Sequence, residues 1–253
     1  PSEYLSPGKN LGFGGGLALA GQHALQKFSS LTHLLIVDDD AILAPTDLAT
    51  LLSSMQKHSA GSIAPFLVDS EEKLQEVPEP TSWSLARAFR TVGQNLVAAR
   101  ALAPTGYPMA WCIGPCLLAD RSTWLRAGPP RSDMIAYGDD IEFSLRLSAA
   151  SPAWAEPSVA VTHAPPTATR SPFEAPPESA RLGAKKGQYK KFGMLLQNLA
   201  FTCVNSPRPR PLPLYLPGNA RRFLQTFGFT PANILELTRR YTLGLLGFPP
   251  RQP

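Results

Sequence analysis

Three consecutive aspartates, Asp38, Asp39 and Asp40, directly follow the apolar run 34–37. Such a run predicts a buried strand, and open α/β sheets bind ligands just beyond the carboxyl ends of their strands. Side chains two apart on an extended chain point the same way, so Asp38 and Asp40 are expected to face one cation while Asp39 turns aside. Oxygen ligands of this kind suit Mg²⁺ or Mn²⁺. The alternative is that the aspartates only end the strand and start the turn before Pro45.

A second acidic group, Asp139, Asp140 and Glu142, opens a predicted helix. Asp139 and Glu142 have the spacing of a capping box, and Glu142 lies one helical turn from Arg146, with which it is expected to pair. This structural account leaves Asp140 unexplained. A carboxylate placed there could act as a general base.

Two further side chains are candidates for the same site. His163 ends the apolar segment 158–162, where it is either structural or the third ligand of a cation held by Asp38 and Asp40. Trp111 is either a core residue or an aromatic surface on which the apolar face of a sugar stacks.

A glycine-rich segment at residues 10–16 precedes an expected helix. Asn10, Gly14 and Gly15 are candidates for phosphate or sugar binding, because glycines before a helix let such a group approach the helix N-terminus. The alternative is a tight helix entry with close packing. Leu17 stands where a dinucleotide fingerprint needs its third glycine, which disfavours a nicotinamide enzyme.

Apolar strands alternate with helices up to residue 163, which predicts the α/β fold class. We expect helices at 14–29, 45–58, 84–102 and 139–149, strands at 33–38, 62–68, 111–118 and 153–163, and a loop at 69–81. The chain starts without a strand pattern, whereas nucleotide-binding α/β units open with a strand, so we expect the first strand to be missing. Beyond a Pro-rich stretch we predict a basic helix at 178–205 and two short helices within 219–247.

The composition restricts the partners. The net charge of +5 and the pI of 9.3 suit an anionic partner, and no apolar run is long enough for a transmembrane helix. The three cysteines match neither a disulfide framework nor a zinc site. Basic residues at 185–191, 221–222 and 239–240 support a rival hypothesis, a nucleic-acid- or anionic-membrane-binding protein without catalysis. This charge is spread out, and no nucleic-acid-binding motif accompanies it.

The order of these motifs along the chain resembles that of the family 2 glycosyltransferases with a GT-A fold. The motifs are the asparagine and glycine segment, the aspartate run, Trp111 to Gly114, the acidic helix start and His163. The rhamnosyltransferase- and galactofuranosyltransferase-like members of bacterial cell-surface synthesis are the most similar. The resemblance covers about residues 8–165. It implies a mostly parallel, GT-A-type sheet flanked by helices in a catalytic core at 1–165, followed by a Pro-rich linker and a C-terminal helical extension at 166–253.

The resemblance also implies roles for the acidic residues. Asp38 and Asp40 would bind Mn²⁺ or Mg²⁺ and the donor diphosphate, and His163 would complete the metal site. Asp39 would lie near the donor sugar or ribose, and Asp140 would be the catalytic base.

The remaining implied roles concern substrates. Asp139 would assist the base and, with Glu142, Trp111 and Gly114, hold the acceptor, while Asn10, Gly14 and Gly15 would contact the donor. The implied donor is UDP- or dTDP-linked, the acceptor is a glycan or lipid-linked molecule, and no nucleic acid is expected. The implied location is the cytoplasm, with peripheral contact at the inner face of the plasma membrane.

Overall fold

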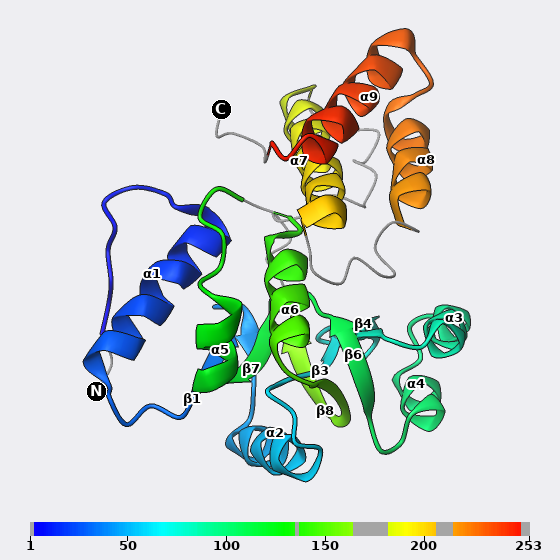
Figure 1. Ribbon diagram of the computed structural model, residues 1–253. Coiled ribbons are helices and arrows are strands. Elements are labelled where there is room, and N and C mark those ends of the chain that lie inside the picture. Colours follow the sequence, from blue (N-terminus) through cyan, green and yellow to red (C-terminus); the bar gives the residue numbers. More distant parts are fainter. Residues whose placement is uncertain (1–2, 135–136, 164–181, 206–214, 249–253) are drawn as a thin grey trace. The chain divides into compact units, whose positions relative to one another are not determined.

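The computed structural model describes residues 3–134, 137–163, 182–205 and 215–248 (Figure 1). The chain divides into two compact units. Unit 1 comprises residues 1–22, 130–139 and 167–253, and unit 2 comprises residues 23–129 and 140–166. Within the described ranges, no helix has both the length and the apolar character needed to cross a membrane. The predicted domain boundary at residue 165 stays a prediction.

Unit 2 is built on one mixed β-sheet, which confirms the α/β class. Its strands are β1 (His33–Val37), β2 (Ala41–Ile42), β3 (Ser62–Val68), β4 (Leu74–Glu76), β5 (Glu79–Pro80), β6 (Tyr107–Trp111), β7 (Cys116–Asp120) and β8 (Ala153–His163). Their order is β1-β7-β3-β8-β6-β5, with β2 paired to β8 and β4 to β3. The pairing differs from the mostly parallel sheet that we predicted. Of the pairs described, only β3 and β8 are parallel, because the reversed strand β7 separates β1 from β3.

Helices flank this sheet. They are α2 (Pro45–Lys57), α3 (Trp83–Val92), α4 (Leu96–Leu102), α5 (Arg121–Ala127) and α6 (Asp139–Ala150), and α1 (Gly12–Lys27) runs into unit 2 from unit 1. Helix α2 places Leu51 and Met55, four residues apart, on one face, and they pack with Ile63 and Val161 in the main core. All seven residues of β3 are buried, as expected for a central strand.

Three predicted elements differ from the structure because of local backbone chemistry. The single helix expected at 84–102 is two helices, since Gly93 takes a positive φ of 57° and Asn95 caps α4. The single strand expected at 111–118 is the end of β6 and the start of β7, which Gly114 and Pro115 separate. The loop expected at 69–81 contains the short strands β4 and β5.

Helix α6 is attached to the end of β6 and to the segment that follows it by buried side-chain hydrogen bonds. The hydroxyl of Ser148 donates to the carbonyl of Ala110 (2.8 Å). One turn earlier, the Ser144 hydroxyl accepts from the Cys112 N–H (3.1 Å) and is within hydrogen-bond distance of the Cys112 carbonyl (3.0 Å). Four residues of a helix span about 6 Å, and two residues of an extended chain span about 6.6 Å. Residues one turn apart on α6 can therefore bond to every second residue of the extended segment.

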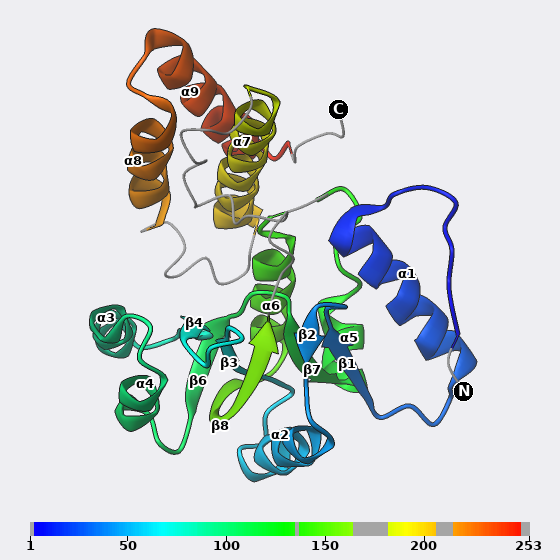
Figure 2. The same ribbon diagram turned by 180° about the vertical axis from the view of Figure 1, so that it is seen from behind.

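The C-terminal part of unit 1 contains α7 (Leu182–Asn205), α8 (Tyr215–Phe227) and α9 (Pro231–Leu245) (Figure 2). Phe192, Leu196, Phe223 and Leu237 form their shared core. The predicted break between two helices near residue 228 is confirmed, because α8 ends before Gly228, whose φ is +96°, and α9 starts after the capping Thr230. The predicted helix start at residue 178 lies outside the described residues.

The attachment of α6 predicts a stability change. Replacing Ser144 by alanine leaves the buried N–H of Cys112 without its partner, so we expect Ser144→Ala to lower the free energy of unfolding by about 1–3 kcal/mol. The control Ser84→Ala removes an exposed hydroxyl and should change it by less than about 0.5 kcal/mol. Urea denaturation measures both. Equal effects of the two substitutions would contradict the proposed attachment.

Candidate metal and carboxylate site

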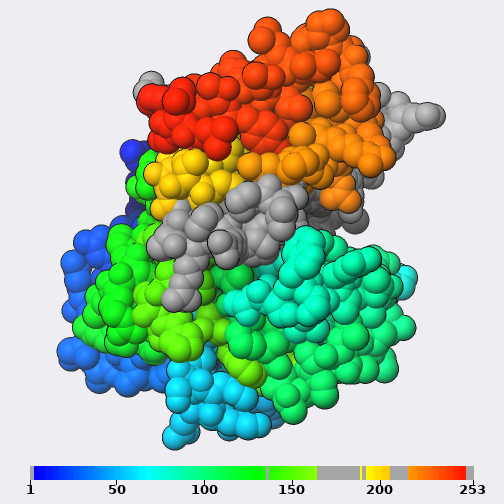
Figure 3. All heavy atoms as spheres, turned by 45° about the vertical axis from the view of Figure 1, so that its right-hand side comes forward, coloured from blue at the N-terminus to red at the C-terminus, as the bar shows by residue number. Residues whose placement is uncertain are grey.

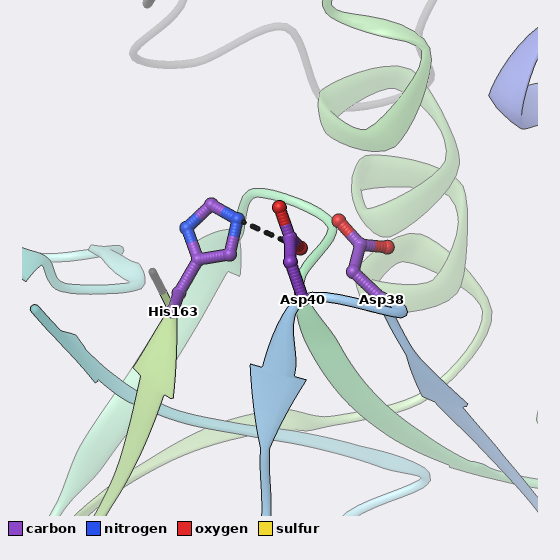
Figure 4. A group of neighbouring side chains, drawn as sticks. All are labelled: Asp38, Asp40 and His163. Carbon is purple, nitrogen blue, oxygen red and sulfur yellow. Dashed lines mark ion pairs between the residues drawn. The ribbon is translucent and has the colours of Figure 1, made fainter. Parts of the chain in front are cut away.

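Asp38, Asp40 and His163 form a cluster of three potential metal ligands (Figure 4). One ligand atom from each lies within 4.8 Å of the others. The Nε2 atom of His163 is 3.3 Å from Oδ1 of Asp40, and all three side chains are partly buried. The structure therefore brings together the three residues that the sequence predicted as ligands. Asp39, between the two acidic ligands, is exposed.

Backbone pairing brings these residues to one place. Ala41 of β2 lies opposite His163 of β8 in an antiparallel ladder, which puts Asp40 beside the histidine. Asp38 follows β1, and its N–H donates to the carbonyl of Pro115 (3.1 Å). Its own carbonyl accepts from the N–H of Ala41 (3.1 Å), which closes a tight turn over the aspartates.

Negative charge predominates around Asp38. Burial raises the pKa of Asp38, and the charges of Asp40, Asp140 and Asp39 raise it further, whereas His163 acts in the opposite direction. A divalent cation would relieve this repulsion. Two carboxylates and an imidazole are also a donor set that such an ion accepts, so the residues present fit a metal site.

Asp140 is held at the start of α6 by two backbone N–H groups. Its Oδ2 accepts from Gly114 (2.9 Å), and its Oδ1 accepts from Ile141 (2.8 Å). Asp140 lies one helical turn before Ser144, so its bond to Gly114 extends the series of hydrogen bonds that attaches α6 to the β6–β7 segment. Since Pro115 binds the Asp38 backbone, the Gly114-Pro115 turn anchors both Asp38 and Asp140. Each carboxylate oxygen can accept more than one hydrogen bond, which is compatible with a proton-accepting role.

The glycine segment forms a closely packed helix entry in unit 1. A Cβ on Gly14 would lie 2.5 Å from the carbonyl oxygen of Arg131, and one on Gly15 would lie 2.9 Å from Leu11 Cβ. The N–H of Gly14 donates to the buried carboxylate of Asp139 (3.0 Å). Close packing explains both glycines, and the bond to Gly14 gives Asp139 a structural role.

Asn10 has a local structural role as well. Its side-chain oxygen accepts a hydrogen bond from the N–H of Gly12 (2.8 Å), the first residue of α1. Donor contacts by Asn10, Gly14 and Gly15 stay predictions. These residues belong to unit 1, whereas Asp38, Asp40 and His163 belong to unit 2.

Two residues that we predicted for acceptor binding are buried. Glu142 pairs with Arg146 through two hydrogen bonds (2.7 and 2.9 Å), which confirms the predicted ion pair. Arg146 also donates to the carbonyls of residues 127–129, so this pair joins α6 to the end of α5. Trp111 is only 6% exposed and pairs with Glu79 in the sheet. Packing accounts for Glu142 and Trp111, and their acceptor roles stay predictions.

The sequence reasoning missed Glu76, which lies in the segment predicted as a loop. It ends β4 and lines a small hollow with residues of β3, the β4–β5 connection, the β6–β7 turn and the start of β7: Ala64, Pro65, Leu67, Val77, Pro78, Cys112, Ile113 and Cys116. Burial raises the pKa of Glu76 to about 7, and the charges of Glu79 and Asp140 add to the shift. The hollow therefore adjoins the turn that holds Asp140.

No protein-family model matches this sequence, and no curated protein is significantly similar to it. Among solved structures, the chain is similar to GalNAc-T7 crystallised with UDP, GalNAc and Mn²⁺. The sequence identity is 12% and the TM-score is 0.43, and the match covers 93% of this chain and 46% of that chain. The chain thus spans about half the length of this structural neighbour.

Metal affinity tests the cluster directly. Asp40→Asn keeps the size of the side chain but removes a charged ligand, so we expect Mn²⁺ affinity to fall at least about tenfold, or 1.4 kcal/mol. Asp39→Asn removes the same charge from the exposed neighbouring residue and should retain most of the affinity. Isothermal titration with Mn²⁺ alone measures both. Similar losses in the two variants would show that only the general negative charge matters.

Glu76 makes stability depend on pH. Its pKa is about 7 in the folded protein against 4.5 as the ordinary value, so the unfolded chain loses this proton first as the pH rises. The contribution of Glu76 to stability is therefore greatest below pH 4.5 and is lost as the pH rises to 7. Glu76→Gln should gain stability relative to the wild type over this range, by on the order of 3 kcal/mol. Denaturant unfolding at pH 5 and pH 8 measures the difference, and an equal offset at both values would contradict the assignment.

Proposed function

We propose that this protein is an inverting, metal-dependent glycosyltransferase that moves a sugar from a nucleotide-diphosphate donor to an acceptor hydroxyl. The observation that carries the proposal is the cluster of Asp38, Asp40 and His163, with Asp140 anchored by the neighbouring turn. A cation site next to a separately held carboxylate is the minimum that such a transfer needs.

Asp38, Asp40 and His163 would hold the metal ion. Of the two candidate ions, the imidazole in this donor set favours Mn²⁺ over Mg²⁺. The ion, when bound, supplies positive charge that offsets the charge developing on the leaving nucleotide diphosphate. With that charge offset, the leaving group would not need a proton from an acidic residue.

Asp140 would be the general base. It takes the proton of the acceptor hydroxyl as the acceptor oxygen forms a bond to the anomeric carbon. The bond from that carbon to the diphosphate oxygen breaks in the same step, and its electrons leave with the diphosphate. A single displacement inverts the anomeric centre. The N–H groups of Gly114 and Ile141 keep the carboxylate oriented for this step.

Substrate contacts extend this proposal. Exposed Asp39 is suited to hydrogen bonds with the donor sugar or ribose, and Asn10, Gly14 and Gly15 remain candidates for the donor.

The proposed substrates follow the sequence resemblance. UDP- or dTDP-linked rhamnosyl or galactofuranosyl groups are the first donors to test, with a cell-surface glycan or lipid-linked acceptor. We propose a cytoplasmic site of action for this reaction.

Loss of the base tests the mechanism. With Mn²⁺ and a panel of sugar nucleotides and acceptors, the protein should release nucleotide diphosphate in an acceptor-dependent reaction. We expect Asp140→Asn to lower turnover at least about 100-fold, the lower end of general-base contributions, while Mn²⁺ affinity changes little.

A matched control is Glu71→Gln, which makes the same carboxylate-to-amide change at an exposed loop position. It should retain the wild-type rate. Undiminished transfer by Asp140→Asn would remove the base assignment, and release of nucleotide diphosphate without any acceptor requirement would indicate a hydrolase instead.

A further inference from the structure

The basic charge of this chain is concentrated at its C-terminal end. Residues 182–253 contain eleven lysines and arginines and a single acidic residue, Glu236, whereas residues 1–181 contain thirteen basic and eighteen acidic residues. The overall charge of +5 is therefore the sum of an acidic N-terminal region and a strongly basic C-terminal region. Such asymmetry is typical of a segment that contacts an anionic surface.

Helix α9 within this basic region exposes an apolar face. Ile234, Leu235 and Leu245 are spaced along the helix so that they share one side with Thr238 and Thr242, and all five are exposed. Exposed Leu246 follows directly, and Phe229 and Phe248 lie just beyond the two ends. The space-filling view shows orange-red and red atoms of α9 at the surface (Figure 3).

The opposite side of α9 packs against α7, so this face cannot turn inward. Gly244 lies so close to the carbonyl of Gln197 that a Cβ would clash with it. Arg240 donates to the side chain of Gln197 (3.0 Å), and buried Leu237 contributes to the shared core. The exposed side chains are thus held in a fixed orientation on a packed helical unit.

We propose that this α9 face, defined by Ile234, Leu235, Leu245 and Leu246, docks on an anionic lipid bilayer. An apolar helix face enters the boundary between headgroups and acyl chains, and neighbouring basic residues are attracted to acidic headgroups. Exposed Arg221 and Arg222 on α8 supply such charge, whereas exposed Arg239 on α9 pairs with Glu236 through two hydrogen bonds (2.8 Å each). This binding is separate from the proposed glycosyl transfer and does not depend on it.

Charge and chemistry favour a bilayer over the other occupants. A second copy of this chain would bring two strongly basic regions together, which costs electrostatic energy. A nucleic acid would meet aliphatic and threonine side chains on α9, whereas single-strand binding depends on aromatic platforms. Of these three occupants, only a lipid surface combines negative charge with an apolar interior.

The test is co-sedimentation of the full chain with vesicles. We expect binding to equimolar phosphatidylcholine and phosphatidylglycerol, weaker binding at high salt, and little binding to phosphatidylcholine alone. The double variant Leu235→Glu/Leu246→Glu changes two exposed side chains of the face (69% and 65%) and should weaken binding at least tenfold.

The matched control is Val97→Glu/Leu125→Glu, which makes the same charge change at two exposed apolar positions of unit 2 and should keep wild-type binding. Equal losses in both double variants, or no binding by the wild type, would overturn the proposal. So would a dimer of the free protein that dissociates in Leu235→Glu/Leu246→Glu, because the face would then bind a second copy. Transfer to a water-soluble acceptor should be unchanged in Leu235→Glu/Leu246→Glu, which separates this outcome from failure of the proposed function.

Discussion

The turn at Gly114 and Pro115 is the constraint on which the candidate site depends. Its N–H at Gly114 holds the Asp140 carboxylate, and its carbonyl at Pro115 holds the backbone of Asp38. The turn is itself positioned by α6, whose Ser144 and Ser148 bind the preceding segment at matching intervals. Two acidic groups from distant parts of the chain are therefore oriented by adjacent peptide groups. A rigid backbone anchor of this kind reduces the reorganisation that a reaction would otherwise require.

Electrostatics favours a cation in this arrangement. The charges of Asp40 and Asp140 both act against the charged form of Asp38, and the turn and the β2–β8 pairing hold these residues in place. Glu76 in the adjoining hollow adds a carboxyl group whose pKa is raised to about 7. The alternative, that the aspartates only end a strand, does not explain why these carboxyl groups are clustered, because clustering them destabilises the fold. Under the proposed function, a bound metal ion would offset this cost.

The sequence predicted those features that depend on local patterns. The strand before Asp38, the helix after Pro45 and the strand ending at His163 follow from apolar periodicity, and the metal cluster follows from the strand ends. Tertiary contacts determined the rest. The two residues of β2 are too few to show a period, although their pairing brings Asp40 to the histidine. Likewise, Glu76 lies in a polar, Pro-rich segment whose short strands have no signal of their own.

The central claim is that Asp38, Asp40 and His163 bind one divalent metal ion. Anomalous X-ray diffraction at the manganese edge, from crystals of this protein grown with Mn²⁺, tests it most directly. A single strong peak between these three side chains is the predicted result. An absent peak at saturating Mn²⁺, or a peak held by other residues, would contradict the account.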